Sequence, residues 1–570
     1  MSTVTEAMLE VLADAGVRHV FGIPGDAVNA IIDGIRRSDR LTFVHVRHEE
    51  VGAFAASAQA KLAGGPAAVV GTAGPGAVHL LNGLYDAARD HAPVIAITGE
   101  TETNLLGTAA HQEIGQAALF ADVAVFSESV VHAGQMPTLA VEACQAALAA
   151  GGVAHLAIPA NLAEQETDGA RHGVVVRREP RTRPAEEDLH DALRLIREAR
   201  RPLVLAGIGA KDAVEELLEF AERLGAPIIK TLPAKALFAD DHPLTVGGLG
   251  LLGTRAAVNA VDDCDLLLMV GTDFPYLDFY PEGVPAIQFE LERSRVGRRY
   301  PVEVALVGHA KLTLQALLEQ IDHRDDRAFL ESAQQDMVRW RRWMRRLETD
   351  DSSPIKPERL AAVAGSLLTD DAIVTLDTGA VTAWIARHLA ARQGQQLTLS
   401  GNLASMGYGL PAAIGAQLAF PHRQVVAFVG DGSFTMLPGD LMTAADLQLP
   451  ITVVIFDNRK LGLITVEQQA EGFADQQTGI PEHDLATIAR SFGVEGIRVE
   501  DPAQLEGALR EAFASDRPTV VDVLVDPDQM PIPPRIELAE ALGFAEAKVK
   551  EFFGIGQSDG GFEALLAPLR

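Results

Sequence analysis

The sequence predicts an α/β protein with three doubly wound parallel-sheet domains and a short C-terminal tail. Two patterns predict this fold. Short apolar runs alternate with segments of helical periodicity, as in parallel sheets whose strands are buried on both faces. Several of these runs end in glycine-rich turns, where doubly wound sheets gather their functional groups. The length of 570 residues fits about three domains.

Changes in composition divide the chain into units. A linker rich in Pro, Arg and Glu covers residues 177–187. Further on, a charged helical stretch with Trp340 and Trp343 leads to a turn containing Ser and Pro at 352–357. Such stretches are typical of domain boundaries. The predicted units are three domains, at residues 1–180, 188–325 and 358–530, and a tail at residues 531–570.

The composition is that of a globular protein with large cores, since 48% of the residues are hydrophobic and 22% are charged. The formal net charge of −30 argues against nucleic-acid binding, which needs a basic surface. Cys144 and Cys264 lie in apolar patterns, which favours free thiols in a reducing compartment. The chain shows neither a basic signal region nor an apolar run of the ~18 residues that span a bilayer. We expect a cytoplasmic protein, with any membrane contact peripheral at the inner face.

Two apolar runs of the third domain, 425–429 and 451–456, end in polar residues. The first run ends in Gly430-Asp431-Gly432 and the second in Asp457-Asn458, and a crossover helix is predicted between them at 436–449. The carboxyl ends of parallel strands meet at one sheet edge, so Asp431 and Asn458 should lie side by side. Their oxygen atoms suit Mg²⁺, and Gly432 and Ser433 suit a phosphate.

This pattern, G-D-G followed about two dozen residues later by Asn, resembles the signature of thiamine diphosphate enzymes, although G-D-G alone is also an ordinary turn. The resemblance implies that Mg²⁺ is held by Asp431, the side chain of Asn458 and the carbonyl group of Lys460. It also implies that Gly430, Gly432 and Ser433 contact the cofactor.

The first domain carries a second motif of this family. The segment R-H-E-E-V-G-A-F-A-A resembles its first-domain signature, which implies that the Glu49 carboxyl group binds the aminopyrimidine ring of thiamine. A glutamate is also what the start of any helix favours. Further positions match cofactor-contacting segments of the family: Gly25, Gly74, Gly76, Asn82, Gly379, Ala404, Ser405, Met406, Leu461, Gly462 and Leu463.

The resemblance implies that three side chains transfer protons to or from the substrate: His111, Gln112 and Glu467. His111 stands where the oxidases of the family carry Phe, and Leu463 stands where the quinone-reducing members carry Phe. A histidine at this place suits proton donation, and it equally suits packing and hydrogen bonding.

The middle domain carries three further motifs, at residues 247–253, 271–281 and 286–292. They resemble the pyruvate oxidase and pyruvate dehydrogenase (quinone) branch, which binds FAD there. Glu290 departs from the Asp that is usual in the family, and the Pro that follows it is missing. The implied FAD contacts are Leu249, Gly250, Leu251, Leu252, Thr272, Asp273, Phe274, Pro275, Tyr276 and Glu290.

The resemblance favours oxidative decarboxylation of a 2-keto acid, foremost pyruvate, to acetate or acetyl phosphate, with electrons passing through FAD to a quinone or oxygen. The alternatives are a carboligase or decarboxylase similar to acetolactate synthase, with FAD idle or absent, and a non-catalytic assembly protein. In this family the site spans two subunits, which implies a homodimer or a dimer of dimers. The end of the tail, residues 560–570, has an apolar face (Phe562, Leu565, Leu566 and Leu569) but one basic residue, a poor composition for binding anionic membranes.

Overall fold

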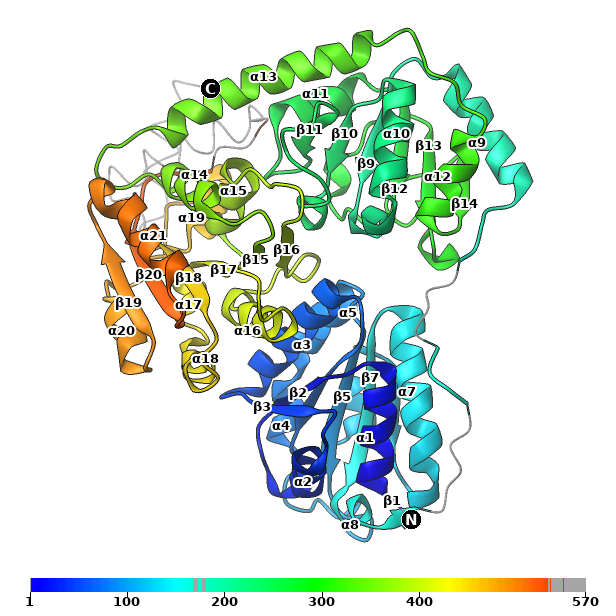
Figure 1. The fold of residues 1–570 in the computed structure, drawn as a ribbon, viewed down its shortest axis with the longest axis vertical. Coiled ribbons are helices and arrows are strands. Elements are labelled where there is room, and N and C mark those ends of the chain that lie inside the picture. The colour runs from blue at the N-terminus through cyan, green and yellow to red at the C-terminus, as the bar shows by residue number, and fades with distance from the viewer. Residues whose placement is uncertain (1, 168–172, 177–180, 532–533, 535–546, 548–570) are drawn as a thin grey trace, which may run out of the picture.

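The computed structural model describes residues 2–167, 173–176, 181–531, 534 and 547, and these form three six-stranded parallel sheets. Figure 1 shows the central domain above, the N-terminal domain below and the C-terminal domain beside them. The predicted fold class is confirmed. The apolar face of the tail predicted at Phe562 to Leu569 lies outside the described residues. Within them, no helix is both long enough and apolar enough to cross a membrane.

The N-terminal sheet has the strand order β3-β2-β4-β5-β7-β6. If the six strands are numbered from 1 in chain order within the domain, the order across the sheet is 2-1-3-4-6-5. Its strands are β2 (His19–Gly22), β3 (Thr42–His45), β4 (Ala67–Gly71), β5 (Val94–Glu100), β6 (Ala124–Ser129) and β7 (Val153–Pro159). Its longer helices are α1 (Val4–Ala15), α2 (Asn29–Arg37), α3 (Glu49–Ala63), α5 (Leu81–Arg89) and α7 (Met136–Ala150).

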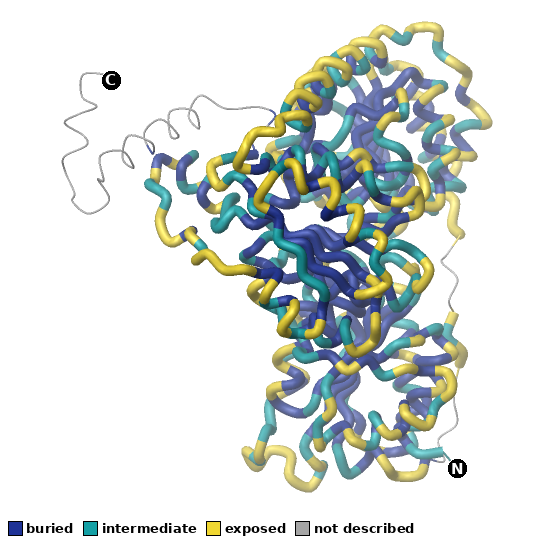
Figure 2. Tube along the Cα trace, turned by 60° about the vertical axis from the view of Figure 1, so that its left-hand side comes forward, coloured by how far each residue is buried: buried dark blue, intermediate teal, exposed yellow. Residues whose placement is uncertain are grey.

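The C-terminal sheet repeats the same order, as β16-β15-β17-β18-β20-β19. Its strands are β15 (Ile373–Leu376), β16 (Gln396–Leu399), β17 (Val425–Gly430), β18 (Ile451–Asp457), β19 (Glu495–Val499) and β20 (Thr519–Leu524). Figure 2 shows this sheet as a buried layer inside its domain. Its helices include α14 (Pro357–Leu367), α15 (Ala380–His388), α16 (Gly409–Ala419), α18 (Leu441–Asp446), α19 (Gly462–Ala470), α20 (Leu485–Ser491) and α21 (Leu505–Ala514).

The central sheet has a different order, β11-β10-β9-β12-β13-β14, which is 3-2-1-4-5-6 along the domain. This is the strand order of dinucleotide-binding domains. The strands are β9 (Pro202–Ala206), β10 (Ile228–Lys230), β11 (Thr245–Gly248), β12 (Leu266–Val270), β13 (Ala286–Glu290) and β14 (Val304–Val307). The helices are α9 (Glu186–Glu198), α10 (Val214–Leu224), α11 (Arg255–Asp263), α12 (Ala310–Leu318) and the long α13 (Ala328–Glu348), which reaches the C-terminal domain.

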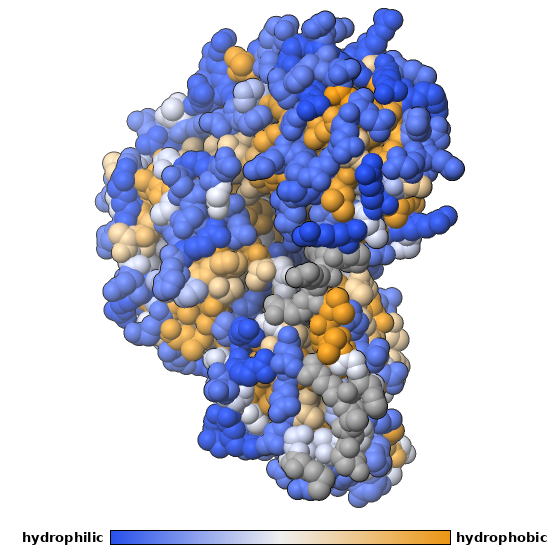
Figure 3. Space-filling view, turned by 45° about the vertical axis from the view of Figure 1, so that its right-hand side comes forward, coloured by the Kyte–Doolittle hydropathy of each residue, from blue (hydrophilic) through white to orange (hydrophobic). Residues whose placement is uncertain are grey.

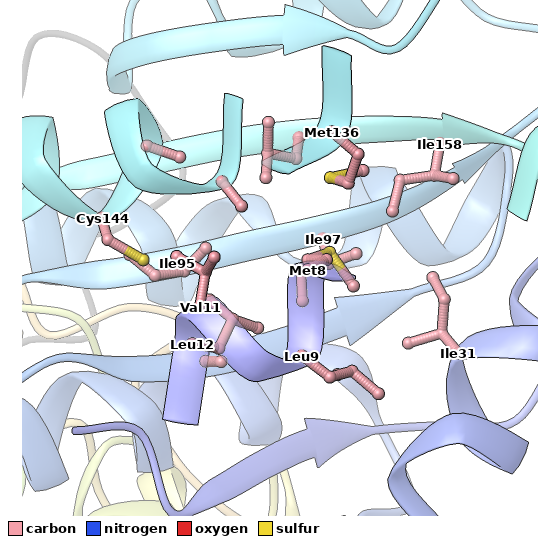
Figure 4. Close-up of a cluster of buried hydrophobic side chains, with 14 of the residues drawn as sticks. Met8, Leu9, Val11, Leu12, Ile31, Ile95, Ile97, Met136, Cys144 and Ile158 are labelled. Carbon is pink, nitrogen blue, oxygen red and sulfur yellow. The ribbon is translucent and has the colours of Figure 1, made fainter. Parts of the chain in front are cut away.

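The core of the N-terminal domain explains the helical pattern at the start of the chain. Met8 and Leu12 of α1 pack with Ile95 and Ile97 of β5 and with Cys144 of α7, all fully buried (Figure 4). Burying each large aliphatic side chain contributes roughly 1.5–3 kcal/mol. Cys144 is buried in this apolar setting and forms no disulfide with another described residue.

The prediction of a single crossover helix at 436–449 is wrong. The segment forms a 3₁₀ turn at Pro438–Asp440 and the short α18, and a four-residue helix, Asp431–Phe434, precedes them. Pro438 and Gly439 explain the interruption, because proline lacks a backbone N–H donor and glycine disfavours a helix interior.

The N-terminal and C-terminal domains pack through α3 and α16. A Cβ atom on Gly415 of α16 would lie 2.2 Å from the carbonyl oxygen of Ala55 in α3, so only glycine permits this approach. The backbone N–H of Arg47 donates to Asp440 Oδ1 at 2.9 Å, and Thr443 Oγ1 donates to the His45 carbonyl at 3.1 Å. In Figure 3 the outer surface of the central domain is mainly hydrophilic, and apolar side chains gather toward the middle of the molecule.

Candidate active site

Glu49 is the first residue of α3 and is nearly buried, with 6% of its surface exposed. Oε2 lies 3.0 Å from Nδ1 of His79. Oε1 lies 3.2 Å from where a Cβ atom would stand on Gly76, so this glycine leaves space beside Oε1. The helix N-terminus favours a negative charge here. The geometry therefore presents one free carboxyl oxygen beside a glycine turn, as an aminopyrimidine ring requires.

Gly74 and Gln112 meet at the turn that follows β4. Gly74 has φ +66°, and a Cβ atom on it would lie 2.9 Å from Cβ of Gln112. Only glycine tolerates this position, because the positive φ is strained for other residues and an added Cβ atom would clash with Gln112. Glu113 accepts a hydrogen bond from Ala110 N–H at 2.9 Å, which closes the loop that carries Gln112. The neighbouring His111 is exposed.

Asp431 follows β17 and is 3% exposed. Its Oδ2 atom has no hydrogen-bond partner among the described residues. Burial, and then the charge of neighbouring Asp457, raise the pKa of Asp431 well above its ordinary value. An orphaned buried carboxyl oxygen beside a second carboxylate fits a divalent cation.

Asn458 lies beyond the end of β18, which pairs with β17, so Asp431 and Asn458 follow neighbouring strands at the same sheet edge. Asn458 Oδ1 accepts the backbone N–H of Lys460 at 3.2 Å. This bond folds the Asn458–Lys460 turn, which contains both remaining predicted metal ligands.

The loops around this edge leave room for an anion. Cβ atoms added to Gly379, whose φ is +137°, or to Gly430 would meet nothing within 4 Å. Asp377 holds the backbone at Gly407 and Gly409 in place, because its carboxyl group accepts hydrogen bonds from their N–H groups at 3.0 and 2.9 Å. The backbone therefore stays close to an open space, as phosphate binding requires.

Met406, Gly432 and Leu461 form one contact group. A Cβ atom on Gly432 would lie 2.9 Å from Leu461 Cδ2 and 3.4 Å from Met406 Cε. Leu463 and Glu467 continue along α19, where Glu467 is exposed. Glu467 is thus accessible to a substrate from the solvent side.

Asn82 joins the two halves of the candidate site within one chain. Its Nδ2 donates to Ser405 Oγ of the C-terminal domain at 3.0 Å and to Glu50 Oε1 at 2.6 Å. Glu50 directly follows Glu49, and Met406 directly follows Ser405. A single chain therefore already connects the Glu49 region with the Met406 group, whereas the expectation that two subunits share the site stays a prediction.

The predicted FAD residues lie at the carboxyl edge of the central sheet, in the loops after β11 and β12 and, for Glu290, at the last position of β13. Gly250, with φ +92°, would bring a Cβ atom within 3.2 Å of Phe274 Cζ. Asp273 pairs with Arg299 at 2.7 Å, and Glu290 Oε1 accepts the N–H groups of Leu291 and Glu292. Large apolar side chains at this edge are each more than a third exposed: Ile208, Leu251, Tyr276, Leu277 and Leu291.

Sequence reasoning missed two residues of the candidate site. His79 contacts Glu49, although its surrounding sequence shows only a helical pattern. Asp377 lies two residues before Gly379, one of the expected cofactor contacts, and its carboxyl group holds Gly407 and Gly409 in place. No local pattern marks either role, since both depend on contacts between distant segments.

Magnesium should stabilise the protein more at pH 8 than at pH 6. A raised pKa means that folded Asp431 keeps its proton where unfolded Asp431 has lost it, and the cation must displace that proton. We expect the apparent Mg²⁺ affinity, measured by thermal shift, to rise at least about tenfold over this interval. The Asp431→Asn variant should show no shift at either pH. An equal wild-type shift at both values would contradict the role of Asp431.

Three family models match the chain, described as the N-terminal TPP binding domain (residues 2–119), the central domain (189–317) and the C-terminal TPP binding domain (377–523) of thiamine pyrophosphate enzymes. Among curated relatives, the YdaP protein of Bacillus subtilis (strain 168), named for its thiamine pyrophosphate, is 43% identical over 97% of this chain and 96% of its own.

Two further relatives carry different activities in their names. The pyruvate oxidase of Lactiplantibacillus plantarum is 32% identical over 92% of this chain and 89% of its own. The acetolactate synthase large subunit of Parasynechococcus marenigrum is 33% identical over 91% of this chain and 87% of its own. The chain belongs to the thiamine pyrophosphate enzyme family.

Proposed function

We propose that this enzyme uses thiamine diphosphate, Mg²⁺ and FAD to decarboxylate a 2-keto acid oxidatively, with pyruvate as the foremost substrate. Carbon dioxide leaves, and the remaining two-carbon unit is released as acetate with water or as acetyl phosphate with phosphate. The two electrons pass to FAD and then to a quinone or oxygen. The bound thiamine supplies the nucleophile for the keto carbon, and the flavin supplies the electron acceptor.

The central domain carries this proposal. Its strand order is that of dinucleotide-binding domains, in which a ligand lies where the order reverses, here between β9 and β12. Exposed apolar side chains follow both strands, Ile208 after β9 and Tyr276 and Leu277 after β12. An apolar edge of this kind is what a flavin ring would cover.

The other residues take the roles that the family pattern implies. Glu49 holds the aminopyrimidine ring through its carboxyl group, at the space that Gly76 leaves open. Asp431, Asn458 and the Lys460 carbonyl would hold Mg²⁺, whose charge offsets the buried Asp431 carboxylate. Substrate protons are handled by His111 and Gln112, in a loop of the N-terminal domain, and by Glu467 of α19.

A carboligase similar to acetolactate synthase is the second candidate. The observations that favour it are His111 and Leu463, which replace the two Phe residues of the oxidase pattern. A pyruvate oxidase and an acetolactate synthase are similar to this chain at almost the same identity, 32% and 33%.

The colour of the purified protein separates these candidates. A flavoenzyme oxidising pyruvate should be yellow, and pyruvate should bleach its absorbance near about 450 nm under anaerobic conditions. Repeating the experiment with a panel of 2-keto acids identifies the substrate, and adding a quinone or oxygen identifies the acceptor. A colourless protein that makes acetolactate or acetoin would overturn the oxidase in favour of the carboligase.

We also propose a homodimer at minimum, with a dimer of dimers as the favoured assembly. Sedimentation velocity at the protein concentrations of the activity assay should then show at least two chains per particle. An active monomer would contradict this prediction.

A further inference from the structure

His79 connects the nearly buried Glu49 to the solvent. It lies in the short helix α4 (Pro75–His79), which follows the glycine turn after β4. Nδ1 of His79 is 3.0 Å from Oε2 of Glu49, the oxygen that faces away from Gly76. The His79 side chain is 45% exposed, whereas that of Glu49 is 8% exposed. The imidazole is therefore placed between the carboxyl group and water.

His48 supports the His79 ring from one side. The two rings stack with centroids 4.6 Å apart and an interplanar angle of 27°. Nδ1 of His48 accepts the backbone N–H of Glu50 at 3.2 Å, so this atom carries a lone pair and no proton. His48, Glu49 and His79 lie close enough to share a cation. The contact of His79 Nδ1 with Glu49 Oε2 also suits the transfer of a proton between an exposed ring and a nearly buried carboxyl group.

We propose that His79 is the proton relay between solvent and the carboxyl group of Glu49. When the carboxyl group gives its proton to the bound ring at Oε1, the protonated His79 returns one through Nδ1 to Oε2. Rotation of the carboxyl group brings this proton back to the ring side. Solvent then reprotonates the exposed imidazole, and the proton that the ring later gives back to Glu49 leaves by the same path in reverse, so each cycle ends with no net gain or loss of protons. His79 acts through Glu49 and is a positioning residue, whose hydrogen bond also keeps Oε1 directed toward the space beside Gly76.

This inference rests on the binding of thiamine by Glu49, the part of the proposed function that the oxidase and the carboligase share. Proton exchange at C2 of bound thiamine diphosphate depends on that part alone. It is therefore measured by rapid quenching in D₂O and proton NMR, for the wild-type protein, His79→Ala and His79→Gln, with and without added imidazole. Cofactor affinity is measured separately by titration calorimetry. The matched control is His190→Ala, which removes an exposed histidine of α9 in the central domain.

We expect both His79 variants to bind thiamine diphosphate within about threefold of wild type and to exchange the C2 proton at least about tenfold more slowly. Imidazole should restore exchange in His79→Ala but should not change Glu49→Gln, and His190→Ala should behave like wild type. Unchanged exchange in His79→Ala would overturn the relay, as would slow exchange that imidazole does not restore. If the wild-type protein exchanges the proton no faster than free cofactor, the thiamine site itself is refuted. If it exchanges rapidly without oxidising pyruvate, the relay stands and only the oxidase assignment falls.

Discussion

Glu49→Gln should lower the turnover number by about 10²–10⁴-fold, the range that a positioned acid or base contributes. Glutamine keeps the size and polarity of the side chain, but it cannot exchange a proton with the cofactor ring. It can still donate a hydrogen bond toward Nδ1 of His79, so the first turn of α3 should stay intact. Steady-state kinetics with saturating cofactor measure the loss, and the melting temperature should remain close to that of wild type.

The neighbouring Glu50→Gln variant is the matched control. Glu50 occupies the same turn of α3, and its side chain accepts the Asn82 amide at 2.6 Å, a bond that glutamine can also accept. Its turnover should stay close to wild type. If both variants lost turnover equally, the cause would be the negative charge at the start of α3 and not the Glu49 carboxyl group itself. Full activity of Glu49→Gln would contradict the assigned role of Glu49.

The fold and the two halves of the candidate site could be predicted because their signals are local. An apolar run that ends in Gly430-Asp431-Gly432 predicts a buried strand and a polar turn at once, and β17 ends within this turn. The shape of the crossover could not be predicted in this way. Helical periodicity continues through 436–449, but Pro438 and Gly439 divide the segment, and their effect outweighs the pattern.

Contacts between distant segments carry little sequence signal. His79 reads as an ordinary helix residue until the fold places it against Glu49, 30 residues away. The pairing of Asn82 with Ser405 spans 323 residues, and no periodicity predicts it. The strand order of the central sheet likewise depends on the whole domain, although the sequence alone shows the glycine turns at its strand ends.

Lys61→Ala should be the most destabilising single substitution at the contact between the N-terminal and C-terminal domains. Lys61 Nζ lies 2.8 Å from Asp86 Oδ2 and 2.7 Å from Asp90 Oδ2, and it donates to the Leu399 carbonyl at 3.0 Å. Asp90 in turn accepts the N–H groups of Gly401 and Asn402. Removing the ammonium group leaves a fully buried carboxylate at Asp86 without its cation, which costs about 3–5 kcal/mol.

The pH dependence of this cost near neutrality should come from Asp86 and not from Lys61. Burial lowers the pKa of Lys61, but the charge of Asp86, with smaller contributions from Tyr408 and Asp90, outweighs it and leaves the pKa above its ordinary value. A raised lysine pKa gives stability that is complete below the unfolded value and is lost only as alkaline pH passes the folded value. Burial raises the pKa of Asp86, and removing Lys61 takes away the charge that opposes this rise. The folded variant should then keep a proton on Asp86 that the unfolded chain has lost, so the urea midpoint of Lys61→Ala should fall further at pH 8 than at pH 6.

Two comparisons decide whether the buried charges are the cause. Arg36→Ala removes an exposed cation that pairs with Asp33 on α2, and it should hardly move the midpoint. Lys61→Met combined with Asp86→Asn and Asp90→Asn removes all three charges while keeping most of the volume, and it should recover part of the loss. If this triple variant is no more stable than Lys61→Ala, lost packing rather than an unpaired carboxylate explains the destabilisation, and the ion cluster is not what holds the two domains together.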